Sequence, residues 1–169
     1  MRPTERPVAR RPPGGISLKS ITRAQIGWAA LAALTITWVL WLALRPGRAV
    51  DTLNLTPLYG SMRALRCLLN ACPAAAGSAR LLFVNVLGNV AVFVPIGLSL
   101  AGALGPGSRV RQVWGALALG AGLSLVIELA QLGIPGRATD VDDLLFNTMG
   151  AALGATCLVA LQRRLARNV

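Results

Sequence analysis

The sequence predicts an all-α integral membrane protein, a four-helix bundle preceded by a disordered basic N-terminal tail. Of its 169 residues, 54% are hydrophobic and only 14% are charged, whereas a soluble domain carries about 25% charged residues. The apolar residues form four runs of about twenty, the length at which a helix crosses a bilayer. The length of the chain fits a single domain.

Residues 1–24 form the predicted tail, in which six residues are basic, one is acidic and four are prolines that interrupt helices. A second basic tail covers residues 163–169. The net charge of +11 lies mostly in tails and loops, as topology signals and lipid anchors do, and no aromatic residues alternate with the arginines. We therefore expect membrane lipids and no nucleic acid among the partners.

The predicted membrane domain covers residues 25–162. Its four helices are expected over residues 26–44, 81–104, 113–133 and 141–161, with a long outer loop over residues 45–80. The first run is longer than a signal-peptide core and no clean small-x-small cleavage site follows it, so we interpret it as an anchor. Eleven basic residues fall on the side of the N-terminus and six on the other side. This bias predicts a multi-pass protein with both termini cytoplasmic.

The outer loop has an apolar stripe with helical spacings of three and four, formed by Leu55, Leu58, Met62, Leu65 and Leu69. It predicts a short amphipathic helix that lies on the membrane surface or packs on the other spans. Cys67 lies within this segment and Cys72 shortly after it, and the two are candidates for a disulfide. Such a bridge requires the helix to end between them, as Asn70 and Pro73 would allow.

Polar side chains gather in the outer halves of the last three predicted spans and in the turn between two of them. Their spacings place those on one helix along a common face. The candidate ligand-binding residues are Asn85, Asn89, Glu128, Gln131, Arg137, Asp140, Asp143 and Asn147. A charged group inside a membrane is costly unless it is paired or reaches water. We therefore interpret the cluster as a polar site that faces outside.

Structural roles are the alternative for each member of this cluster. Asp142 is most simply a first-turn acid that favours the helix dipole, and Asp140 serves equally well as an N-cap or a site residue. Asn85 and Asn89 could join helices by hydrogen bonds, and Arg137 could pair with Glu128 or Asp143. The chain has no histidine and no paired CxxC motif, so no metal or cofactor is predicted.

Two glycines continue the polar stripe of the last predicted span. Gly150 and Gly154 lie four residues apart, a spacing at which small residues let helices approach closely. They favour tight packing in the inner half of the bundle, and they could also mediate an oligomer.

The ordered pattern of these residues resembles the VanZ-like family. The elements are Asn54-x2-Pro57, Asn85-x3-Asn89-x3-Phe93-x-Pro95-x-Gly97, Glu128-x2-Gln131, and Arg137-x2-Asp140-x2-Asp143-x3-Asn147-x2-Gly150-x3-Gly154. The resemblance covers about residues 26–160. It implies a small four-helix protein of the bacterial cytoplasmic (inner) membrane and a link to the cell envelope, because the family's namesake is associated with teicoplanin resistance. It supplies no reaction.

We considered three functions, of which the sequence favours the first two. The cluster could bind an envelope molecule, such as a lipid-linked precursor, an anionic head group or a glycopeptide, with Arg137 holding a phosphate or carboxylate. It could act on a lipid or lipid-linked envelope substrate, with Glu128 and Asp143 as acid and base or as ligands of a divalent cation. Transport by a monomer is disfavoured, because the inner half of the bundle offers no polar path. The binding function is our expectation.

Overall fold

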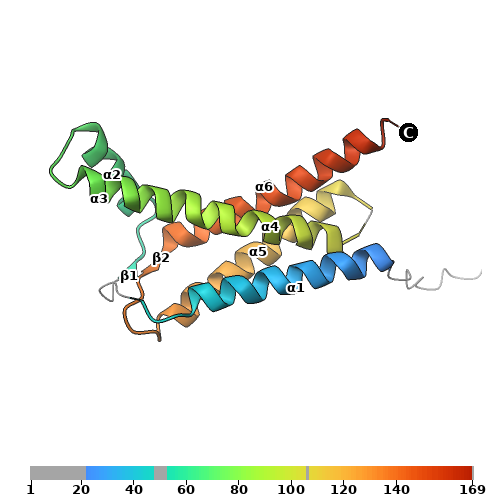
Figure 1. The fold of residues 1–169 in the computed structure, drawn as a ribbon, viewed down its shortest axis with the longest axis horizontal. Coiled ribbons are helices and arrows are strands. Elements are labelled where there is room, and N and C mark those ends of the chain that lie inside the picture. Colours follow the sequence, from blue (N-terminus) through green and yellow to red (C-terminus); the bar gives the residue numbers. More distant parts are fainter. Residues whose placement is uncertain (1–21, 48–52, 106, 169) are drawn as a thin grey trace, which may run out of the picture.

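The computed structural model describes residues 22–47, 53–105 and 107–168. Four helices in this part are long and apolar enough to cross a membrane: α1 (Arg23–Ala43), the continuous helix Ala75–Ala103, α5 (Arg109–Gln131) and α6 (Val141–Leu165). They confirm the predicted all-α membrane bundle (Figure 1). The predicted tail over residues 1–24 lies mostly outside the described residues.

The helix boundaries follow local capping more than the limits of the apolar runs. α1 begins at Arg23, three residues earlier than predicted, because Thr22 and Gln25 form a capping box with hydrogen bonds of 3.2 and 3.0 Å. α5 begins at Arg109 and α6 continues to Leu165, so both extend past the predicted spans 113–133 and 141–161.

The second span consists of three consecutive segments, α3 (Ala75–Leu82), the π-helical η1 (Phe83–Gly88) and α4 (Asn89–Ala103). It begins six residues earlier than the predicted start at residue 81, so the end of the expected outer loop is helical. α4 tolerates Pro95 in its interior. Neighbouring helices compensate in membrane proteins for the backbone hydrogen bond that a proline removes.

The amphipathic helix expected in the outer loop is α2 (Tyr59–Leu69). It buries Ser61 and Ala64, whereas its apolar stripe is exposed, with Met62 at 45% and Leu69 at 76% of their surface. The described residues therefore leave the stripe largely uncovered, and its contact with a membrane surface stays a prediction.

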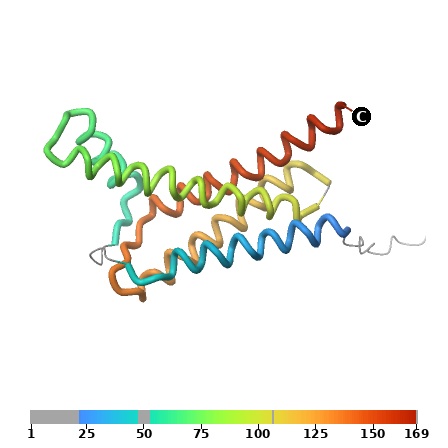
Figure 2. The backbone as a smooth tube through the Cα atoms, in the orientation of Figure 1, coloured from blue at the N-terminus to red at the C-terminus, as the bar shows by residue number. Residues whose placement is uncertain are grey.

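The connection before α2 contains β1 (Leu53–Asn54), which pairs in parallel with β2 (Thr139–Asp140) ahead of α6. This short ladder ties the outer loop to the α5–α6 connection (Figure 1). Figure 2 shows that the first turn of α1, the α4–α5 connection and the end of α6 lie at one end of the bundle, and that α2 lies at the opposite end. We call the latter the α2 end.

The core is formed where α6 packs on α4 and α5 and where α1 packs on α4. A Cβ on Gly150 or Gly154 would collide with the backbone of Val90 or Val94 in α4, and one on Gly97 would collide with Ala151 of α6. The glycines of α6 are thus occupied by contacts within the same chain, as expected for tight packing. An oligomer formed through Gly150 and Gly154 would have to displace α4.

Candidate functional site

The predicted polar cluster is built at the α2 end, where α5 stops and α6 starts. After Gln131 the chain turns through Gly133 and Gly136, whose φ of 71° favours glycine. Asp140 then caps α6, because its Oδ1 accepts a hydrogen bond of 2.9 Å from the backbone N–H of Asp142. The last turn of α5 and the first turns of α6 consequently present their side chains to the same region.

A cavity of about 200 Å³ lies between α1, α4, α5 and α6. Six of the eight predicted site residues line it: Asn89, Glu128, Gln131, Arg137, Asp143 and Asn147. The rest of its wall is apolar and includes Val39, Phe93 and Ile127 of the core. We call this space the polar cavity. It combines a few convergent polar groups with apolar walls, as small-molecule sites do.

Glu128 reaches the polar cavity from the last turns of α5 and is only 6% exposed. Its Oε2 accepts a hydrogen bond of 3.1 Å from the backbone N–H of Asp140. Asp140 Oδ1 in turn accepts one of 2.9 Å from the amide of Asn54 in β1. Asp140 does not line the cavity itself, so it acts here as an N-cap and a link between α5, α6 and β1.

Asp143 joins α6 to α4 across the polar cavity. Its Oδ1 accepts a hydrogen bond of 2.6 Å from the amide of Asn89. Neither Glu128 nor Asp143 forms an ion pair with another described residue. The two carboxyl groups therefore share one cavity with the Arg137 guanidinium but form no ion pair with it, an arrangement that costs free energy in a membrane.

Two buried oxygen atoms of the polar cavity have no hydrogen-bond partner. They are Oε1 of Gln131 and Oδ1 of Asn147, on side chains that are only 7% and 5% exposed. Gln131 donates its amide N–H to the carbonyl of Ala43 at 3.1 Å, and Asn147 donates to Ser124 at 2.9 Å. Because a carbonyl can only accept, the contact with Ala43 identifies the amide nitrogen of Gln131 and leaves Oε1 as its unpaired atom. Buried acceptors without partners are rare and call for an explanation.

Arg137 differs from the prediction. Its Nε and Nη2 donate hydrogen bonds of 2.8 and 2.7 Å to the backbone carbonyls of Arg45 and Leu42, and it forms no ion pair with Glu128 or Asp143. Leu42 lies in the last turn of α1, where helix geometry leaves acceptors unpaired, and Arg45 follows the C-cap Leu44. Arg137 lines the polar cavity, but two of its donors are taken by α1.

Asn85 is the predicted site residue that the structure leaves apart. It lies in η1, does not line the polar cavity, and its side chain makes no hydrogen bond to another described residue. The wider turn of a π-helix changes the side-chain register between Asn85 and Asn89 that an α-helical spacing of four implies. Only Asn89 reaches the site.

Asp142 has a role that its position in the first turn of α6 does not indicate. It is 1% exposed, and its carboxylate accepts hydrogen bonds from the backbone N–H of Leu58 and from the Ser61 hydroxyl, the latter at 2.9 Å. It therefore attaches α2 to α6. The sequence holds one signal for this contact, a polar Ser61 among the apolar residues of an amphipathic helix.

The disulfide candidates come together beyond the end of α2. The helix stops at Leu69, Ala71 takes a positive φ of 47°, and the sulfur atoms of Cys67 and Cys72 are in bonding contact with their Cα atoms 5.1 Å apart. The break in the helix is the one that the sequence suggested near Asn70. The state of the two thiols in cells stays a prediction.

A bound cation would find few ligands in the polar cavity. Within residues 22–47, 53–105 and 107–168, no three side chains of Asp, Glu, His or Cys are grouped as a potential metal site. Glu128 and Asp143 would have to be supplemented by the oxygens of Gln131 and Asn147.

A protein-family model described as VanZ/LLP1 matches residues 26–162. The chain belongs to the VanZ/LLP1 family. The match confirms the resemblance seen in the residue pattern and covers all four membrane helices, α2 and the polar cavity. None of the curated proteins and none of the solved structures matches the chain. Family membership establishes a multi-pass membrane protein of this type, and the polar cavity itself must indicate what the protein does.

Proposed function

We propose that this VanZ/LLP1 protein binds part of a cell-envelope molecule in the polar cavity. The observation that carries the proposal is the pair of buried acceptors without partners, Gln131 Oε1 and Asn147 Oδ1. Leaving a buried acceptor unpaired costs about 1–3 kcal/mol. A ligand that donates hydrogen bonds to both atoms would recover this free energy, which gives the bundle a physical reason to bind one.

The polar lining limits the chemistry of the ligand. Besides the two amide oxygens, the cavity contains the carboxylates of Glu128 and Asp143, each with one oxygen that accepts no hydrogen bond in the structure. Such an acceptor-rich site suits a group with several N–H or O–H donors, such as a sugar, a peptide amide or an amine. Arg137 lines the cavity too, so an anionic part of the ligand would lie next to it.

The volume limits the size of the bound part. About 200 Å³ equals the space of roughly six or seven water molecules in the liquid, each about 30 Å³. A head group or a single sugar or amino acid fits, whereas a complete glycopeptide antibiotic does not. Any contribution to teicoplanin resistance would accordingly act through an envelope precursor, such as a lipid-linked one, and not through capture of the antibiotic in this cavity.

The experiment compares two substitutions in the cavity with a control substitution at a buried glutamine outside it. Gln131→Met and Asn147→Leu remove the cavity acceptors, whereas Gln112→Met removes a buried amide that donates to Ala101 outside the cavity. The probe is a fluorescent short-chain analogue of a lipid-linked cell-wall precursor, titrated onto purified protein. Loss of one hydrogen bond predicts an affinity about 5- to 100-fold lower for each cavity variant, with little change for Gln112→Met.

Two outcomes would count against the proposal. If Gln112→Met weakens binding as much as Gln131→Met does, the effect follows general packing and the cavity is not the site. If the wild-type protein does not bind the probe, the lipid-linked precursor is excluded as the ligand.

The two carboxyl groups in one cavity favour an intramembrane enzyme as the second candidate. Glu128 and Asp143 would serve as general acid and base on a lipid or lipid-linked substrate. Turnover of the same probe, measured by mass spectrometry and lost in Glu128→Gln and Asp143→Asn while binding persists, would support it. An unchanged rate in both variants would exclude these carboxyl groups from a reaction.

A further inference from the structure

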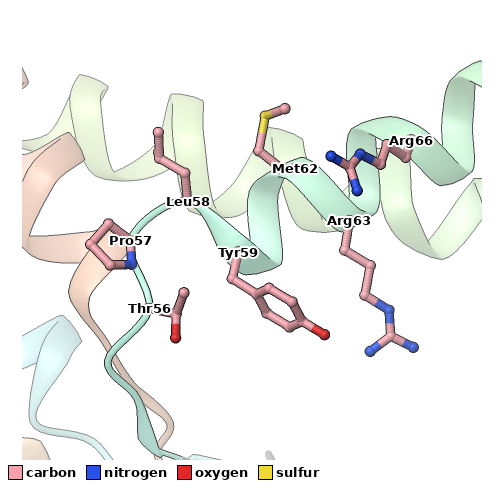
Figure 3. A pocket seen from close by; sticks show the side chains of 7 residues that line it. All are labelled: Thr56, Pro57, Leu58, Tyr59, Met62, Arg63 and Arg66. Atoms are coloured by element: carbon pink, nitrogen blue, oxygen red, sulfur yellow. The ribbon is translucent and has the colours of Figure 1, made fainter.

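A second concave site lies on the outward face of α2, separate from the polar cavity. It is a groove of about 300 Å³ whose lining includes Leu58, Tyr59, Met62, Arg63 and Arg66. Figure 3 shows Tyr59 and Arg63 extending from the helix in the same direction, while the guanidinium of Arg66 turns back toward Met62. We call this site the α2 groove.

The groove faces away from the protein because α2 is attached by its other side. Ser61 and Ala64 are the buried residues of α2, and Ser61 is held by the carboxylate of Asp142. Tyr59, Arg63 and Arg66 follow helical spacings of four and three, so they share the opposite face. The attachment at Asp142 fixes the direction in which this face points.

The charge of the α2 groove is positive and unbalanced. No acidic residue lines it, and neither Arg63 nor Arg66 donates a side-chain hydrogen bond or forms an ion pair with another described residue. Asp142 does not line the groove. It is 1% exposed beneath α2, and its carboxylate already accepts hydrogen bonds from Leu58 and Ser61. Both guanidinium groups of the groove are therefore without an anionic partner among the described residues.

The length of the second span indicates where α2 would lie relative to a bilayer. The second span has 29 residues, which at 1.5 Å per residue extend over about 44 Å, more than the roughly 30 Å of a hydrocarbon core. The excess of about 14 Å is close to the length of α3, which contains Arg80, so we place α3 in the head-group layer, and α2 packs beside α3 (Figure 1). The exposed apolar stripe of α2, which includes Met62 and Leu65, borders the arginine face.

We propose that the α2 groove binds the phosphate of an anionic phospholipid in the leaflet at the α2 end. Arg63 and Arg66 would donate N–H groups to the phosphate oxygens, for which the guanidinium fork is well shaped, and the Tyr59 hydroxyl is a further donor. The apolar stripe would contact the upper part of the acyl chains. This stripe is why we assign a phospholipid and not a free phosphate. The inference does not depend on the function proposed for the polar cavity.

The test uses full-length protein in a neutral detergent and calorimetric titration with three probes. These are dihexanoyl phosphatidylglycerol, dihexanoyl phosphatidylcholine and inorganic phosphate. Arg63→Gln combined with Arg66→Gln should lower the affinity for phosphatidylglycerol roughly thirtyfold, because each basic residue near a lipid surface contributes about a factor of five. The matched control, Arg163→Gln with Arg164→Gln, removes the same charge from the exposed end of α6 at the opposite end and should leave the affinity unchanged.

A milder variant separates geometry from charge. Arg63→Lys with Arg66→Lys keeps both charges but loses the forks, so an intermediate affinity is expected. Equal affinity in the glutamine variant and the wild type would overturn the assignment. Equally tight binding of phosphatidylcholine would exclude a site for anionic head groups, and equally tight binding of inorganic phosphate would show a free-anion site with no lipid preference.

Discussion

Replacing Asp142 by alanine should detach α2 from the bundle without unfolding the bundle. The carboxylate accepts two hydrogen bonds, from the N–H of Leu58 and from the Ser61 hydroxyl, and it is 1% exposed. Hydrogen bonds to a charged group contribute about 1.5–3 kcal/mol each, so their loss should weaken the attachment of α2 by about 3–6 kcal/mol. At the lower value the detached population would rise roughly a hundredfold.

Limited trypsin digestion of protein in nanodiscs measures this population, because α2 contains Arg63 and Arg66. A detached helix of 11 residues is too short to stay folded alone, and cleavage then follows the detached fraction. Asp142→Ala should raise the cleavage rate at these sites by about two orders of magnitude. Ser61→Ala, which removes one of the two hydrogen bonds to Asp142, should raise it about tenfold at the lower value of about 1.5 kcal/mol.

Cleavage at Arg163 and Arg164, at the far end of α6, is the internal control and should not change. A rate at Arg63 and Arg66 that is the same in Asp142→Ala and the wild type would refute the role of Asp142. Faster cleavage at both ends would show general unfolding and would also contradict a local attachment.

Two further predictions concern packing and topology. Gly154→Ala places a Cβ against the backbone of α4 and should destabilise the protein by about 1–3 kcal/mol. Gly122→Ala is the control, because open space surrounds Gly122. Equal thermal unfolding midpoints of the two variants in detergent would contradict this prediction. In intact cells that carry the Cys157→Ala variant, a membrane-impermeant thiol reagent should label Cys67 and Cys72 only after mild reduction. Labelling without reduction would exclude the disulfide. Labelling only after cell lysis would place the α2 end in the cytoplasm.

The membrane spans could be predicted because each depends on the composition of one continuous segment. The end of α1, the end of α4 and the start of α6 lie within one residue of the prediction, but other boundaries differ because caps and neighbouring helices decide them. The capping box at Thr22 extends α1, and α2 packs beside α3 and supports a helical start at Ala75, where the sequence offers only alanines, Gly77 and Ser78. Hydropathy averaged over a window of residues detects neither the capping box nor the packing of α2 on α3.

The polar cavity could be predicted where its residues share one regular helix. Glu128 with Gln131, and Asp143 with Asn147, lie at spacings that fix a common face, and all four line the cavity. Asn85 does not line the cavity, because it lies in a π-helical segment that changes its register relative to Asn89. The contacts of Asp140 and Asp142 with β1 and α2 connect residues more than eighty positions apart, and no local pattern specifies such pairs.

Arg137 shows why the role of a cavity residue must be tested with its structural contacts in view. Arg137 bonds to the carbonyls of Leu42 and Arg45, and Gln131 bonds to that of Ala43, so both residues clamp the end of α1 to the α5–α6 connection. Since Leu42 and Ala43 form part of the cavity wall, Arg137→Ala would move this wall whether or not a ligand touches the guanidinium. Loss of binding in that variant alone would therefore not assign Arg137 to the ligand. Asn147 is the more decisive position, because its side chain hydrogen-bonds to Ser124 of α5 and does not clamp the end of α1.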